Sequence, residues 1–68
     1  MAVLKVIELL ANSEKSWEDA AQNAVQHASK TIQNIRSVNV QNFSLTVGDD
    51  GKVSEYRVNA KITFEVNA

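Results

Sequence analysis

Acidic side chains gather at the start of the longest helix-periodic stretch of the chain, at Glu14, Glu18 and Asp19. Carboxylate oxygens are the ligands that Ca²⁺ prefers, so oxygens from neighbouring subunits could combine there into a calcium site. Acidic residues at a helix start also accept hydrogen bonds from the free N–H groups and interact favourably with the positive end of the helix dipole. This capping is their commoner role. Glu14, Glu18 and Asp19 are therefore candidate metal ligands, with capping as the alternative.

Other features that could carry chemistry point away from catalysis. The sequence has no cysteine and a single histidine, His27, which borders an apolar stripe and is expected to be solvated. The Asp49-Asp50-Gly51 segment is too short for an EF-hand loop, which spreads its oxygen ligands over about twelve positions. It has the composition of a tight turn instead. No glycine-rich phosphate loop is present, so the sequence predicts a protein that is not an enzyme.

The composition indicates one small domain, residues 1–68, with a net charge of −1 and both signs interspersed. This charge provides no basic surface for nucleic acid, so no nucleic-acid partner is expected. No apolar run reaches the length that spans a bilayer, and the first residues lack the features of a signal peptide. We expect no membrane partner and a cytoplasmic location.

One helix is expected, over residues 16–35. Ser16 is suited to cap its N-terminus, with Asp19 three residues on as a short capping box. At 1.5 Å per residue its length would be about 28–30 Å. The middle of its apolar stripe is alanine, so the surface that covers it must come close. The stripe consists of Trp17, Ala20, Ala21, Ala24, Val25, Ala28, Ile32 and Ile35.

Three strands are expected around this helix. Residues 2–10 are apolar on both alternating faces, with residues 11–15 as a polar link. Residues 37–47 change face midway, which either a β-bulge near residues 41–42 or burial on different faces would produce. Residues 48–52 read as a hairpin turn, and residues 53–66 alternate strictly. The sequence predicts an α+β fold of order β-α-β-β, an antiparallel sheet with the helix across one face.

The last strand is too long for a compact domain of this size. Its 14 or so residues span about 46 Å, whereas a compact chain of this length is about 28 Å across. One helix cannot cover such a strand, and its ends must pack on another molecule. A second copy of the chain is the simplest candidate, so a homo-oligomer is expected.

The sequence resembles the dodecin family over almost its whole length, from about Val3 to Val66. The resemblance rests on the segments KVIEL, SWEDAAQNAV and ASKTIQNIR and on the hairpin pattern GK-x-x-EY-x-V-x-x-K. It implies a three-stranded antiparallel sheet wrapped partly around one helix, and a hollow homododecamer that binds flavin. Trp17, on the apolar face of the expected helix, is predicted to be a core residue.

Two candidate ligand-binding residues, Ser37 and Arg57, depart from the family pattern. The resemblance implies a tryptophan after the helix that stacks on flavin, where this chain has Ser37, and a glutamine on the third strand, where it has Arg57. Serine supplies no stacking, and arginine donates hydrogen bonds but accepts none. The chain is thus similar to dodecins that lack this tryptophan, a branch associated with calcium.

These observations predict a homododecamer that binds or stores a small ligand or an ion, with an impaired flavin site. Its cofactor would be calcium or, more weakly, a flavin such as FMN or riboflavin. The alternatives are a purely structural assembly whose flavin site has decayed, or a weak flavin binder.

Overall fold

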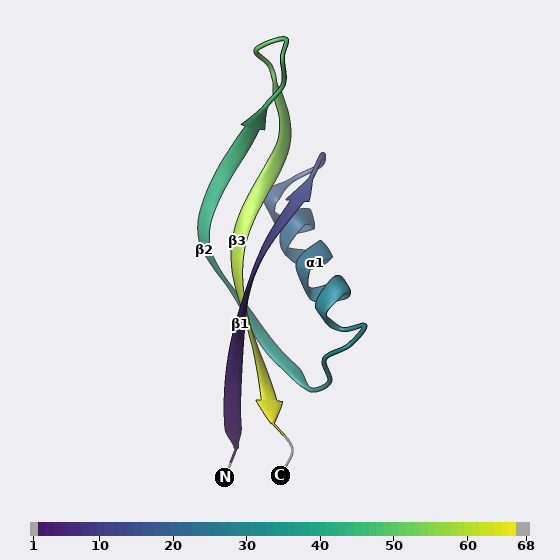
Figure 1. Ribbon diagram of the computed structural model, residues 1–68, viewed down its shortest axis with the longest axis vertical. Coiled ribbons are helices and arrows are strands. Elements are labelled where there is room, and N and C mark those ends of the chain that lie inside the picture. The colour runs from purple at the N-terminus through teal and green to yellow at the C-terminus, as the bar shows by residue number, and fades with distance from the viewer. Residues whose placement is uncertain (1, 67–68) are drawn as a thin grey trace.

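The computed structural model describes residues 2–66, which form one helix and three strands (Figure 1). The elements are β1 (Val3–Ser13), α1 (Trp17–Ala28), β2 (Ile35–Val47) and β3 (Val53–Val66). The sheet order is β1-β3-β2, and β3 pairs antiparallel with both neighbours. The helix lies across one face of this sheet. The predicted α+β fold of order β-α-β-β is confirmed.

The helix is shorter than predicted because α1 ends at Ala28 rather than at Ile35. Ser29 caps it, and the next residues form tight turns in which the N–H groups of Thr31 and Ile32 donate to the Ala28 carbonyl. Asn34 then takes a φ of 64°, which directs the chain into β2. Ile32 and Ile35 fit the helical period but reach the core from a loop and from a strand.

The first strand is longer than predicted, and residues 11–13 belong to β1 rather than to a link. Ile7, Leu9 and Ala11 face the helix and pack against the core. Leu4, Val6 and Leu10 point to the opposite face, where they are 53%, 56% and 68% exposed. The single chain leaves this second apolar row uncovered.

A β-bulge in β2 explains the change of face in its sequence. The pairing with β3 shifts between Val40 and Asn42, which leaves Gln41 as the extra residue. As a result Val40 lies opposite Ala60 and Phe43 opposite Val58, so both apolar sets of β2 face the helix. The predicted bulge is confirmed, and burial on two different faces is the wrong alternative.

The hairpin between β2 and β3 also agrees with the prediction. The Gly48 N–H donates to the Lys52 carbonyl at 2.9 Å, and Gly51 has a φ of 78°, a conformation that side chains disfavour. The bounds of β3 are those predicted from its alternation.

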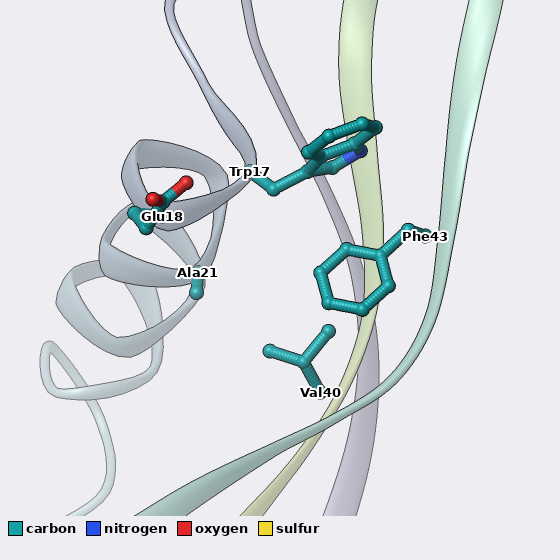
Figure 2. A pocket seen from close by; sticks show the side chains of 5 residues that line it. All are labelled: Trp17, Glu18, Ala21, Val40 and Phe43. Carbon is teal, nitrogen blue, oxygen red and sulfur yellow. The ribbon is translucent and has the colours of Figure 1, made fainter.

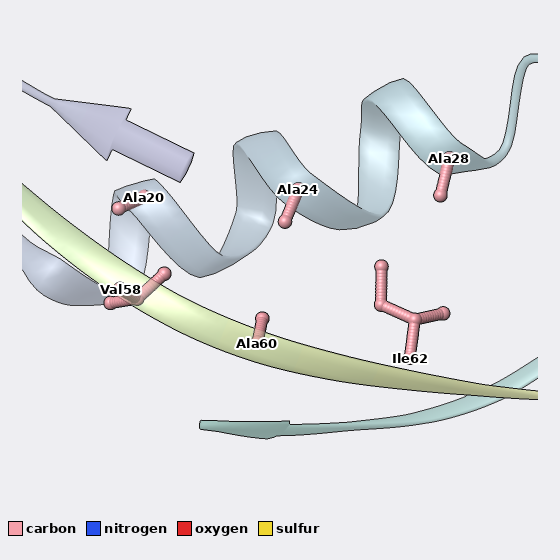
Figure 3. Packing of buried hydrophobic residues seen from close by; sticks show 6 residues of the cluster. All are labelled: Ala20, Ala24, Ala28, Val58, Ala60 and Ile62. Atoms are coloured by element: carbon pink, nitrogen blue, oxygen red, sulfur yellow. The ribbon is translucent and has the colours of Figure 1, made fainter. Parts of the chain in front are cut away.

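The core lies between the alanine stripe of α1 and the middle of β3 (Figure 3). Small methyl groups let the helix approach the sheet closely, as the sequence indicated. All six residues of the core are at most 4% exposed: Ala20, Ala24, Ala28, Val58, Ala60 and Ile62.

The molecule is elongated, with extents of 51 × 20 × 15 Å. Its radius of gyration is 13.8 Å, whereas a compact chain of this length has about 11 Å. The 12 residues of α1 correspond to about 18 Å, so the strands extend beyond both ends of the helix (Figure 1). The prediction that the helix cannot cover the sheet is confirmed.

Candidate functional site

Both candidate ligand-binding residues lie on the face of the sheet away from α1, which we call the open face. Ser37 is opposite Thr63 of β3, and Arg57 lies between Asn12 of β1 and Ser44 of β2. The rest of the β3 row on this face is polar, and its members are Glu55, Asn59, Lys61, Thr63 and Glu65.

The structure does not bring Ser37 and Arg57 together. Ser37 is exposed near the C-terminal end of β3, whereas Arg57 lies six residues earlier on that strand, a separation of roughly 20 Å. Within one chain, a small ligand therefore cannot touch both residues.

Arg57 belongs to a hydrogen-bonded group that sequence reasoning missed. Its Nε donates to Asn12 Oδ1 at 2.9 Å, and Asn12 Nδ2 donates to Glu55 Oε1 at 3.3 Å. Asn12 was assigned to a polar link, so its place beside Arg57 was not foreseen. Extending the alternation of the first strand by two residues would have put Asn12 on the open face.

The three candidate metal ligands are in different states. Glu14 and Glu18 are exposed, whereas Asp19 is half-buried and accepts a hydrogen bond from Ser13 Oγ at 2.6 Å. The Asp19 N–H donates to Ser16 Oγ at 2.9 Å, which confirms Ser16 as the N-cap. The Asp19 carboxylate therefore bonds to the Ser13 hydroxyl, and not to the backbone N–H of Ser16 as it would in a capping box.

No group of three His, Cys, Asp or Glu side chains among residues 2–66 is arranged to hold a metal ion. A calcium site that uses Glu14, Glu18 and Asp19 would need further oxygen ligands, which the sequence prediction expects from neighbouring subunits. Asp50 accepts a hydrogen bond from the Lys52 N–H at 2.9 Å, the turn role expected for it, and His27 is exposed.

An apolar hollow of about 400 Å³ opens between the start of α1 and the bulge of β2 (Figure 2). Trp17 contacts Phe43 and Tyr56 edge to face, with ring centroids 5.5 and 5.2 Å away. Its Nε1 donates to the Ser44 carbonyl at 3.2 Å. Trp17 packs against the core as predicted but is half-buried, because it also lines this hollow with Glu18, Ala21, Val40 and Phe43.

Comparison with known proteins places this fold in a family. The sequence model of the Dodecin family matches residues 3–67. The chain belongs to the dodecin family. This confirms the resemblance and, with it, the fold expected for a dodecin. Within residues 2–66, no helix is long and apolar enough to cross a membrane.

Individual dodecins are similar over most of this chain. The calcium dodecin of Mycobacterium tuberculosis is 36% identical over 66 residues, which are 97% of this chain and 92% of that protein. Its crystal structure, described as that of a calcium-chelating antigen with a novel calcium-binding site, has a TM-score of 0.84 at 35% identity and covers 96% and 91% of the two chains. A mutant of Thermus thermophilus dodecin has a TM-score of 0.90 at 32% identity, with 100% of both chains covered.

Proposed function

We propose that this dodecin forms a hollow homododecamer that binds or stores a small ligand or ion without converting it. The observation that carries the proposal is the apolar surface that one chain leaves uncovered. Dodecin family members are ligand-binding homo-oligomers, which supports self-association.

The uncovered apolar residues form two groups. Leu4, Val6 and Leu10 lie on the open face of β1. Phe43, Leu45 and Val47 lie on the opposite face of β2 toward the hairpin, where Phe43 contacts Trp17 at the start of α1. All six are at least 45% exposed in the single chain. Exposed apolar rows of this kind are typical of subunit contacts, and long uncovered strands otherwise aggregate.

Calcium is the better supported ligand. Ser37 carries no ring, so the stacking contact that the family resemblance implies for flavin is absent from this position. Glu14 and Glu18 are exposed carboxylates, and the similar M. tuberculosis protein is a calcium dodecin. Subunit assembly would supply the further oxygen ligands that Ca²⁺ requires.

Light scattering of the purified protein tests the assembly. We expect a molar mass near twelve times the 7.5 kDa of one chain. Val6→Glu, which places a charge in the apolar row of β1, should lower this mass, whereas Asn39→Glu on the polar part of the same face should not. A wild-type mass near that of one chain would contradict the proposal.

Calorimetric titration with calcium and fluorescence titration with riboflavin and FMN test the ligand. Heat on adding calcium to the assembled protein, with unquenched flavin fluorescence, is the expected result. Strong quenching of flavin fluorescence without calcium binding would show that flavin, and not calcium, is the ligand. If neither ligand bound the intact assembly, the structural alternative would hold in its place.

A further inference from the structure

Arg57 lies on the open face without a direct ion pair to any described residue. It is half-buried on the central strand, and its register neighbours, Asn12 on β1 and Ser44 on β2, are both uncharged. Among residues 2–66 the salt bridge within 4.0 Å joins Arg36 to Glu65, not Arg57 to a carboxylate. A guanidinium in this position is available to an anion.

Asn12 holds Arg57 in place and keeps it apart from Glu55. Its Oδ1 accepts from Arg57 Nε, its Nδ2 donates to Glu55 Oε1, and its backbone carbonyl accepts from Asn23 Nδ2 at 3.1 Å. The Asn12 amide thus lies between a cation and an anion that share one face of β3. With Nε occupied, the two terminal nitrogens of Arg57 keep four N–H donors for another group.

We infer that Arg57, positioned by Asn12, forms an oxyanion site on the open face. The ligand class is a phosphate or carboxylate compound. Ser44, directly across β2, adds a hydroxyl that can donate to the oxyanion. This inference deepens the ligand-binding part of the proposed function and rests on it.

Calorimetric titration of the assembled protein with inorganic phosphate, and with acetate at the same ionic strength, tests the site and separates the two anions. Saturable binding is expected for at least one of them. Arg57→Gln should weaken it roughly tenfold or more, because charge-assisted hydrogen bonds are lost. Lys30→Gln, which removes an exposed cation beyond the end of α1, should leave it unchanged.

Two variants test whether Asn12 positions Arg57 for the anion or only stabilises the fold. Asn12→Ala should weaken phosphate binding because Arg57 can then pair with Glu55. The double variant Asn12→Ala/Glu55→Gln should regain most of the lost affinity, since that competing carboxylate is gone. Circular dichroism and light scattering confirm that each variant still folds and assembles.

Two results would overturn the inference: equal phosphate and acetate affinities in the wild type and the Arg57→Gln variant, or no binding of either anion to the assembled wild type. Calcium binding by the same sample would show that the proposed function stands while this site fails. Loss of assembly in the wild type would instead contradict the proposed function itself.

Discussion

Ser13 Oγ donates a hydrogen bond to Asp19 Oδ2 at 2.6 Å, joining the end of β1 to the first turn of α1. The same hydroxyl accepts from the backbone N–H of Lys15 at 2.9 Å, and Ser13 is only 5% exposed. One buried side chain therefore fixes the loop through which the strand passes into the helix.

Ser13→Ala should lower the free energy of unfolding by about 1–3 kcal/mol, because it leaves the buried loop N–H and the Asp19 carboxylate without their partner. Urea unfolding of the assembled protein measures this loss. Ser29→Ala is the matched control, since Ser29 Oγ donates to the Gln26 carbonyl on the exposed helix surface. Equal effects of the two substitutions would mean that the Ser13 contacts do not stabilise the loop.

The involvement of Asp19 in this loop separates the roles of the three candidate metal ligands. Glu18→Gln should weaken calcium binding roughly tenfold and lower the melting temperature without calcium only slightly, because exposed Glu18 loses only its interaction with the helix dipole. Asp19→Asn should lower that melting temperature further, because Asp19 also bonds to Ser13. Calorimetry and thermal unfolding give the two readouts.

Glu8→Gln, an exposed carboxylate on β1, is the control for the calcium measurement. If Glu18→Gln bound calcium as tightly as the wild type, Glu18 would not be a ligand. The same comparison for Glu14→Gln decides the remaining candidate.

The close approach of α1 to β3 predicts intolerance to larger side chains. Ala24 is 2% exposed and Ala60 is fully buried in the layer between them (Figure 3). Ala24→Leu should destabilise the fold by about 1–3 kcal/mol, since the helix must move away from the sheet. Gln26→Leu adds a similar side chain on the exposed face of α1 and should change stability by less than about 0.5 kcal/mol. Denaturant unfolding that finds the two variants equally stable would show that the layer can expand.

The bounds of β3 and the bulge of β2 could be predicted from the sequence because their signals are local. Alternation along β3 gave its bounds, and the change of face in β2 gave the bulge, since one extra residue must exchange the two faces. The end of α1 could not be predicted in the same way. Ile32 and Ile35 continue the helical period, but they are buried from a loop and a strand. The chain turns at Asn34, but the apolar spacing that continues through Ile32 and Ile35 predicts helix there instead.

The site was less predictable because it depends on register between strands far apart in the sequence. Ser37 and Arg57 were each identifiable from the family pattern, but their separation along β3 follows from the pairing of Ser37 with Thr63. The bond between Asn12 and Arg57 joins residues 45 positions apart and required the end of β1 to be placed correctly.

The exposed position of Ser37 predicts that flavin binding can be restored there. Ser37→Trp should tighten FMN and riboflavin binding roughly tenfold or more, because a stacked aromatic contact contributes about 1–3 kcal/mol. Adding Arg57→Gln should tighten it further, since an amide both donates to and accepts from the polar edge of the flavin ring. Quenching of flavin fluorescence on titration with assembled protein measures each affinity.

Asn39→Trp is the control for this prediction. It places the same ring two residues along the same exposed stretch of β2 and should leave flavin binding as weak as in the wild type. Equal quenching by the Ser37→Trp and Asn39→Trp variants would contradict a specific stacking position, and no gain in either would show that more than the tryptophan is missing.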